Sequence, residues 1–138
     1  HGLVAHMLGC HAAGDDERAV QNRLMMRSVL EDGEFARLSF QRLASNWVGK
    51  VEECVKAAVA AGDALNGPVL PGLRGWFAHH LAVTLMHTFL PARPLVDYGV
   101  SREKLVEQAV WFTLRGMGLK EEAIKRHYNP KALALLTG

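Results

Sequence analysis

The stretch at residues 76–90 reads WFAHHLAVTLMHTFL, and it decides what kind of fold this chain can form. It predicts a helix from about Leu73 to Leu90 in which Arg74 is the one charged side chain when the histidines are neutral. Apolar side chains surround this helix, and a helix of that kind is buried on more than one face. In a chain of 138 residues, we therefore expect it to lie between the chain's own core and a second subunit.

The composition of the rest of the chain also favours helices. Nineteen leucines and 18 alanines accompany a single isoleucine, and no alternating run of β-branched residues predicts a strand. Glycine and proline divide the chain, most clearly at Gly14, Gly33 and the loop Gly62–Gly72. The predicted helices are Leu3–Ala13, Asp15–Leu30, Glu34–Ala61, Leu73–Leu90, Ser101–Met117 and Lys120–His127. We expect residues 1–138 to form a single all-α domain, a bundle of about five main helices with a short C-terminal tail.

The predicted helix Glu34–Ala61 carries one long apolar stripe. Its members recur every three or four residues, as they do on one face of an α-helix. They are Ala36, Phe40, Leu43, Trp47, Val51, Cys54 and Ala58. Glu52 and Lys56, four residues apart, predict an ion pair on the solvated side of the same helix.

Charge and cysteine content argue against several classes of protein. Sixteen lysines and arginines against 14 aspartates and glutamates give a net charge of +2, which is weak support for binding nucleic acid. The 2 cysteines, Cys10 and Cys54, cannot form a disulfide framework, so we expect a reducing compartment and a cytoplasmic protein. No stretch approaches the roughly 20 apolar residues that span a bilayer, and we expect no membrane partner.

The sequence lacks the motifs that carry common enzyme chemistry. It contains no glycine-rich phosphate loop, no HExxH, CxxC or GxSxG, and no Glu-x-x-His of di-iron bundles. We therefore expect neither an enzyme nor a cofactor. His6 and Cys10 lie one helical turn apart, with His11 beside Cys10, and could place two ligands near one metal ion. A pair without a third ligand is weak evidence, so we expect a packed cysteine beside a surface histidine, and no metal.

Two further groups of residues each allow two interpretations. His80 and His87 lie seven residues apart on one helix face, with Thr84 between them. They could form a pH-sensitive or ligand-binding strip, but a hydrogen-bonded helix–helix interface is the simpler interpretation. A group of methionines and aromatic residues suits an adaptable small-molecule pocket, although on periodicity such residues more often fill a core. Its members are Met25, Met26, Phe40 and Trp47.

Two longer runs of sequence resemble a known family. Residues 30–38 read LEDGEFARL and break one helix before the next begins, and residues 105–119 read LVEQAVWFTLRGMGL. Together they resemble the C-terminal regulatory domain of TetR-family transcriptional repressors, in which the last apolar helix ends in an Arg-Gly-x-Gly-Leu-like stop. The resemblance covers the chain from about Leu3 to Leu119, and the tail that includes His127–Pro130 lies outside it.

The resemblance implies a homodimer with two parts per chain. Members of the family read operator DNA with an N-terminal helix-turn-helix head, and their helical body binds a small effector. Two helices of that body form a four-helix bundle with their mates, and Leu73–Leu90 and Ser101–Met117 match them in order and in apolar character. Residues 1–14 show no helix-turn-helix, so we expect this chain to belong to a longer repressor and to reach operator DNA only through a head that it lacks.

The family-like arrangement also implies two sites. An effector pocket would lie between the first helices and the inner side of the helix Leu73–Leu90. Its expected lining residues are His6, Cys10, Met25, Met26, Phe40, Leu43, Trp47, Phe77 and Leu81. His6 and Cys10 would be its polar groups, which suits a hydrophobic or aromatic ligand with one acceptor or carboxylate. The expected dimer contacts are Phe77, His80, Leu81, Thr84 and His87 against Val106, Ala109, Val110 and Thr113.

Two other functions stay open at this point. A helical interaction module would have the same fold with a solid core and no ligand pocket. A small helical enzyme or metal protein would instead use His6, Cys10 and His11, and a stoichiometric bound metal would identify it. A compound bound inside the bundle would favour the effector sensor.

Overall fold

A computed structural model describes residues 15–129 of the chain, apart from the side chains of residues 15–18 and 43–45. Its elements are α2 (Asp15–Leu30), α3 (Glu34–Ser39), the π-helical turn η1 (Phe40–Ala44), α4 (Ser45–Ala60), α5 (Leu73–Thr88), α6 (Arg102–Gly116) and α7 (Glu121–His127). Between residues 15 and 129 there is no sheet, and a lone antiparallel bridge joins Ala64 to Leu119. The predicted all-α class is confirmed. The predicted helix Leu3–Ala13 and the tail from Pro130 lie outside the described residues.

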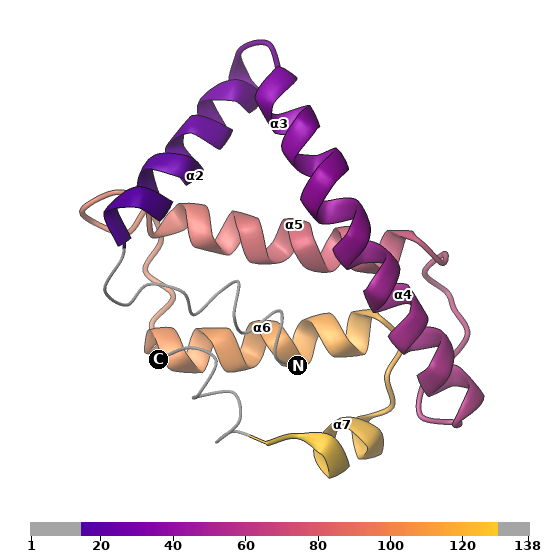
Figure 1. Ribbon diagram of the computed structural model, residues 1–138. Helices are drawn as coiled ribbons and strands as arrows, with labels where there is room; N and C mark the ends of the chain where they lie inside the picture. Colours follow the sequence, from indigo (N-terminus) through magenta and orange to yellow (C-terminus); the bar gives the residue numbers. More distant parts are fainter. Residues whose placement is uncertain (1–14, 130–138) are drawn as a thin grey trace.

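Three sides of a triangle make up the upper half of the molecule in Figure 1. One side is α2, the second is the rod formed by α3, η1 and α4, and α5 runs across beneath them. The third side, α5, meets α2 where Asn22 Nδ2 donates a hydrogen bond to Met86 Sδ at 3.3 Å. Below α5, α6 runs antiparallel to it, and α7 packs against α6. Segments far apart in the sequence therefore face one another across the triangle.

The corner between α2 and α3 follows from its local sequence. Gly33 has a φ of 72°, in the left-handed region that glycine adopts without steric cost. The Asp32 side chain accepts a hydrogen bond from the Glu34 amide at 3.0 Å. The buried Ser28 hydroxyl accepts another from the Ala36 amide at 3.1 Å, which ties the two helices together. The predicted break at Asp32–Gly33 is confirmed, and α2 has the predicted bounds.

The predicted single helix Glu34–Ala61 is interrupted by the π turn at Phe40–Ala44. A π turn inserts one extra residue, and one residue corresponds to a rotation of about 100° around a helix. The apolar stripe is therefore displaced by one position after the turn. Val48 and Val55 are buried, whereas Cys54, a predicted member of the stripe, is exposed.

Close contact between α4 and α5 closes the second corner of the triangle. A Cβ atom at Gly75 would lie 3.1 Å from Cα of Val48, so any larger residue would require the α4 backbone to shift by a few tenths of an ångström. Glu52 does not lie on the solvated side, where an ion pair with Lys56 was predicted. Its half-buried Oε2 accepts a hydrogen bond from the Gly72 amide at 3.1 Å, just before α5 begins. The N-terminal end of α5 carries a partial positive charge that attracts a carboxylate, which explains why Glu52 lies here and not beside Lys56.

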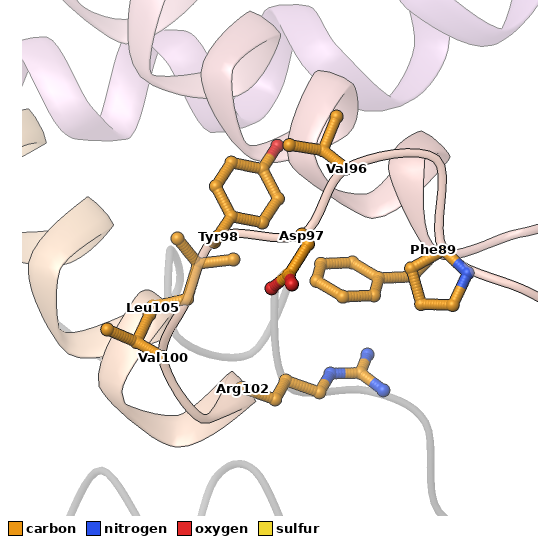
Figure 2. A pocket seen from close by; sticks show the side chains of 8 residues that line it. Phe89, Val96, Asp97, Tyr98, Val100, Arg102 and Leu105 are labelled. Atoms are coloured by element: carbon orange, nitrogen blue, oxygen red, sulfur yellow. The ribbon is translucent and has the colours of Figure 1, made fainter.

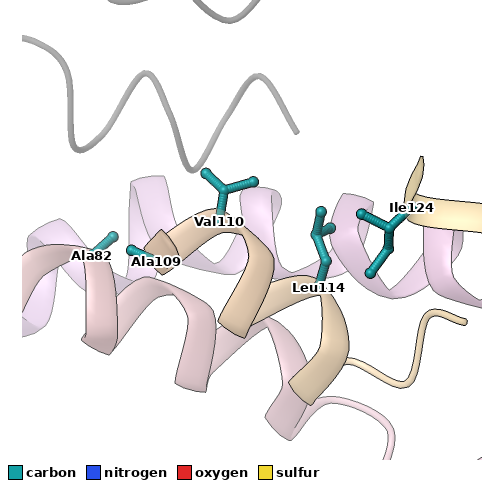
Figure 3. Packing of buried hydrophobic residues seen from close by; sticks show 5 residues of the cluster. All are labelled: Ala82, Ala109, Val110, Leu114 and Ile124. Carbon is teal, nitrogen blue, oxygen red and sulfur yellow. The ribbon is translucent and has the colours of Figure 1, made fainter. Parts of the chain in front are cut away.

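The core lies where α5, α6 and α7 meet, as Figure 3 shows. Val110 and Ile124 are fully buried there, and the alanines Ala82 and Ala109 allow α5 and α6 to approach closely. A second cluster of Val55, Ala78 and Met117 joins α4 and α5 to the end of α6. Trp47 packs against both clusters. None of the helices between residues 15 and 129 has the length and apolarity needed to cross a bilayer.

Candidate functional site

Five aromatic and histidine side chains gather where η1 and α4 face α5. We call Phe40, Trp47, Trp76, His79 and His80 the aromatic–histidine cluster. The Phe40 and His79 rings stand nearly perpendicular, with centroids 5.6 Å apart, and the Trp47 and His79 centroids are 5.8 Å apart. His79 also contacts Trp76 edge to face at 6.2 Å. The cluster therefore brings together the two predicted effector residues Phe40 and Trp47.

The local sequence explains how the cluster forms. His79 and His80 follow Trp76 by three and four residues on α5, so the three rings lie close together on the helix surface, and His79 contacts Trp47 of α4. The π turn begins at Phe40 and presents this ring to the same side, in contact with Trp76 at 6.1 Å. π-Helical turns inside α-helices are frequently found at functional sites. The turn thus coincides with the place where aromatic groups converge.

Two polar atoms of the cluster are buried without a hydrogen-bond partner in the described part of the chain. They are Nε1 of Trp47 and Nε2 of His79, which belong to neighbouring rings on α4 and α5. An unsatisfied buried polar group costs about 1–3 kcal/mol, so native proteins rarely leave one without a reason. The cluster therefore has hydrogen-bonding capacity that these residues leave unused.

Burial affects the protonation of His79. Burial lowers the pKa of His79 below its ordinary value of 6.5, and the neighbouring His80 lowers it further. The His79 imidazole is therefore neutral at pH 7, with one ring nitrogen a donor and the other an acceptor. Burial also lowers the pKa of His87, farther along α5. An uncharged His79 among aromatic rings, with two unpartnered polar atoms, is suited to a small uncharged molecule.

Other residues of the predicted effector pocket fall in several places. Met25 and Met26 are half-buried on α2, close in sequence to Asn22, which contacts α5. Phe77, predicted as an alternative to Leu81, is 56% exposed and lies outside the cluster. A helix turns by about 100° per residue, and Trp76 takes the inward position that Phe77 was expected to fill. Leu81 is half-buried. The Leu43 side chain, His6 and Cys10 are outside the described residues, as is His11 of the possible metal pair.

Sequence reasoning missed Trp76 and His79 as members of this site. The signal was present, because two adjacent histidines in an otherwise apolar helix need polar partners or a special environment. What the sequence did not specify is the rotation of α5 about its axis. A helix that is apolar all round has no single face from which that rotation can be read.

The predicted dimer contacts are separated by the structure into two groups. On α5, His80 and Thr84 are exposed together with Phe77, while Leu81 and His87 are half-buried. On α6, the predicted contacts face the chain's own core, so this part of the prediction is wrong. They are Val106, which is half-buried against the core cluster, and the buried Ala109, Val110 and Thr113.

The reason for this error on α6 is again helix rotation. The Thr113 hydroxyl donates to the Ala109 carbonyl at 2.7 Å, which satisfies it inside the core without a partner chain. The buried side of α6 packs against Ala82 of α5 and Ile124 of α7. Phe112 lies away from that side and is 71% exposed. A second copy of the chain could therefore contact α6 through Phe112 and not through Val110.

A separate hollow of about 300 Å³ lies at the connection between α5 and α6, as Figure 2 shows. Its lining combines apolar and polar side chains and consists of Phe89, Pro94, Val96, Asp97, Tyr98, Val100, Arg102 and Leu105. The Arg102 guanidinium lies over the Phe89 ring, 5.3 Å from its centroid. The Asp97 carboxylate accepts a hydrogen bond from the Gly99 amide at 2.9 Å. The sequence shows this segment as a proline- and glycine-containing loop and gives no other signal for the hollow.

No family model, curated protein or solved structure matches this chain. Among residues 15–129, no three histidine, cysteine, aspartate or glutamate side chains are grouped so that they could hold a metal ion. The aromatic–histidine cluster and the exposed faces of α5 and α6 are the candidate functional surfaces of the described residues.

Proposed function

We propose that this chain is the effector-sensing and dimerisation part of a TetR-like transcriptional repressor, and that a small, hydrophobic or aromatic effector binds at the aromatic–histidine cluster. The observation that carries the proposal is the pair of buried polar atoms, Trp47 Nε1 and His79 Nε2, without partners among the described residues. A ligand between α4 and α5 would supply the missing hydrogen bonds. Its apolar part would lie against the surrounding rings.

The position of the cluster provides a way to transmit binding. It joins η1 and α4 to one side of α5, while Phe77 and Thr84 lie exposed on another side of the same helix. A ligand that favours one placement of α5 would therefore shift the placement of the surface used by a second copy. A preference of a few kcal/mol between two arrangements is sufficient for such coupling. The affinity for operator DNA would change through a helix-turn-helix head outside this sequence.

A second copy of the chain is the partner that the exposed faces favour. Phe77 on α5 and Phe112 on α6 are 56% and 71% exposed, and these helices pack side by side. Large exposed aromatic side chains on neighbouring elements are typical of interaction sites. Symmetric dimers are the commonest assembly that covers such a surface.

The melting temperature in the presence of a panel of small compounds tests the effector role. A compound that binds the native chain raises the melting temperature by mass action. We expect uncharged aromatic compounds to raise it, and we expect Trp47→Phe to weaken the effect. Trp111→Phe is the matched control, since Trp111 contacts Tyr128 at 5.8 Å, away from the cluster. If no compound shifts the melting temperature and the dimer persists, the chain is an interaction module without an effector.

A further inference from the structure

We propose that the group recognised in the aromatic–histidine cluster is the hydroxyl of a phenol, which accepts a hydrogen bond from Trp47 Nε1–H and donates one to His79 Nε2. This inference rests on the proposed effector site and names the class of ligand that the site takes. Three observations support it: the hydrogen-bonding properties of the two unpartnered nitrogens, the rings around them, and the uncharged His79 imidazole.

The two buried nitrogens have complementary hydrogen-bonding roles. The indole Nε1 of Trp47 is only a donor, so it requires an acceptor on the ligand. Nε2 of a neutral imidazole accepts a hydrogen bond when the ring proton is on Nδ1, and the proposal takes His79 in this tautomer. A hydroxyl is the smallest group that accepts and donates through one atom. An ether or a carbonyl would satisfy Trp47 and leave His79 without a partner.

The two nitrogens belong to neighbouring rings. The Trp47 and His79 ring centroids are 5.8 Å apart, and the two rings are inclined at 55°. A ligand that satisfies both nitrogens therefore needs its polar atom where these two rings meet.

The walls of the cluster favour a flat ring attached to that hydroxyl. Phe40 and Trp76 each meet His79 nearly at right angles, with centroid distances of 5.6 and 6.2 Å. Aromatic rings prefer such edge-to-face contacts and offset stacking, which an aliphatic alcohol cannot form. Phe40 also lies edge-on to His80 at 6.5 Å. An aromatic ring would extend a set of contacts that the cluster already uses.

Charge discriminates against acids. Burial and the nearby His80 lower the pKa of His79, so this imidazole offers no positive charge at pH 7. Arg42 and Lys50, the basic residues on either side of Trp47 in the sequence, are exposed, and the buried Arg74 of α5 donates to the Val69 carbonyl at 3.1 Å. A buried carboxylate without a cationic partner is strongly disfavoured. The site therefore favours a phenol over an aromatic acid, in contrast to the carboxylate that the sequence also allowed.

Calorimetric titration of the chain with four ligands at pH 7.5 tests this inference. The ligands are 4-methylphenol, 4-methylanisole, toluene and 4-methylbenzoate, which share one ring and differ in their polar group. We expect 4-methylphenol to bind about tenfold tighter than 4-methylanisole, because one hydrogen bond of ordinary strength corresponds to about that ratio. We expect 4-methylbenzoate to bind most weakly. Equal binding of the phenol and the anisole, or tighter binding of the benzoate, overturns the inference.

Substitutions of the two nitrogen-bearing residues locate the effect. Trp47→Phe and His79→Phe keep an aromatic ring and remove one hydrogen-bonding atom each. We expect both to reduce the preference for 4-methylphenol over toluene, while the control Trp111→Phe keeps it. A preference retained in both variants contradicts the assignment, and if a variant does not fold, the four-ligand comparison on the unaltered chain decides.

The failure of this inference and the failure of the proposed function give different results. Toluene and 4-methylanisole binding as tightly as 4-methylphenol, with all three weakened by Trp47→Ala, would leave an effector site without a phenol preference. No binding by any of the four ligands, together with a melting temperature that a wider panel leaves unchanged, would remove the effector site itself.

Discussion

At the scale of single residues, His79 connects the fold to the proposed chemistry. It contacts Phe40, Trp47 and Trp76, and its Nε2 atom is buried without a partner in the described residues. A proton gained by this buried imidazole would create a charge that water solvates poorly. Protonation of His79 is therefore expected to destabilise the folded state.

Acidification should destabilise the chain through His79. Because burial and His80 lower the pKa of His79 in the folded state below 6.5, the unfolded state binds the proton more tightly. The free energy of unfolding should therefore fall as the pH drops through 6.5, and this loss should level off below the folded-state pKa. Urea unfolding at pH 7.5 and 5.5 measures the difference. His79→Gln should reduce it, and His87, whose pKa burial also lowers, should account for part of the remainder; an unchanged difference in His79→Gln contradicts this account.

Core and surface positions on α6 and α7 should respond differently to truncation. Ile124 is fully buried, so Ile124→Ala should lower the free energy of unfolding by about 2–5 kcal/mol. Phe112 is 71% exposed, so Phe112→Ala should change the stability of the isolated chain by no more than about 0.5 kcal/mol. Denaturant unfolding at a concentration where the chain is monomeric compares the two. Equal losses would show that the buried and exposed sides of α6 and α7 are misassigned.

At the scale of helices, the order of elements could be predicted, but their rotation could not. Capping residues, glycines and prolines specify where a helix begins and ends, which explains why α2, α5 and α6 lie close to their predicted ranges. The phase of α4 depends on a single extra residue in the turn Phe40–Ala44, and no local sequence rule marks a π turn. For this reason Cys54 was placed on the buried stripe that Val55 occupies.

The same limit applies to the candidate site. Phe40 could be predicted because it lies on the apolar stripe where the turn begins. Trp47 could be predicted because it stays half-buried although the stripe is displaced after the turn. Phe77 and Val110 lie on helices with apolar residues on most sides, so the sequence offered several equivalent rotations. Contacts with neighbouring helices determine which rotation each helix adopts, and those contacts depend on the whole fold.

Two glycines provide a matched test of the helix packing between α4 and α5. Gly49 on α4 has nothing within 4 Å of an added Cβ, whereas Gly75 on α5 would place a Cβ 3.1 Å from the Val48 backbone. Alanine is the better helix former by about 1 kcal/mol, so Gly49→Ala should raise the free energy of unfolding by up to that amount. Gly75→Ala should instead lower it, because overpacking costs about 1–3 kcal/mol. Urea titration of both variants decides, and a gain in stability from Gly75→Ala would mean that α4 and α5 are farther apart than described.

At the scale of the whole molecule, the account requires one side of α5 to bind a ligand while another side and Phe112 meet a second copy. Sedimentation at micromolar concentration should show a dimer. Phe112→Glu should give a folded monomer, since a charge at an exposed position does not disturb the core. Val110→Glu should unfold the chain, because Val110 is fully buried within one copy. A folded, monomeric Val110→Glu variant would restore the predicted interface and contradict the structure.

The indole resonances of the ¹⁵N-labelled chain test the central claim most directly. The chain has 3 tryptophans, and each gives one Nε1–H signal that substitution to phenylalanine identifies. On addition of 4-methylphenol, the account predicts a downfield shift of the Trp47 signal as its unpartnered N–H gains an acceptor, with the Trp111 signal unchanged. A Trp47 signal that stays in place at saturating ligand, or a shift confined to Trp111, would contradict the claim that the aromatic–histidine cluster is the effector site.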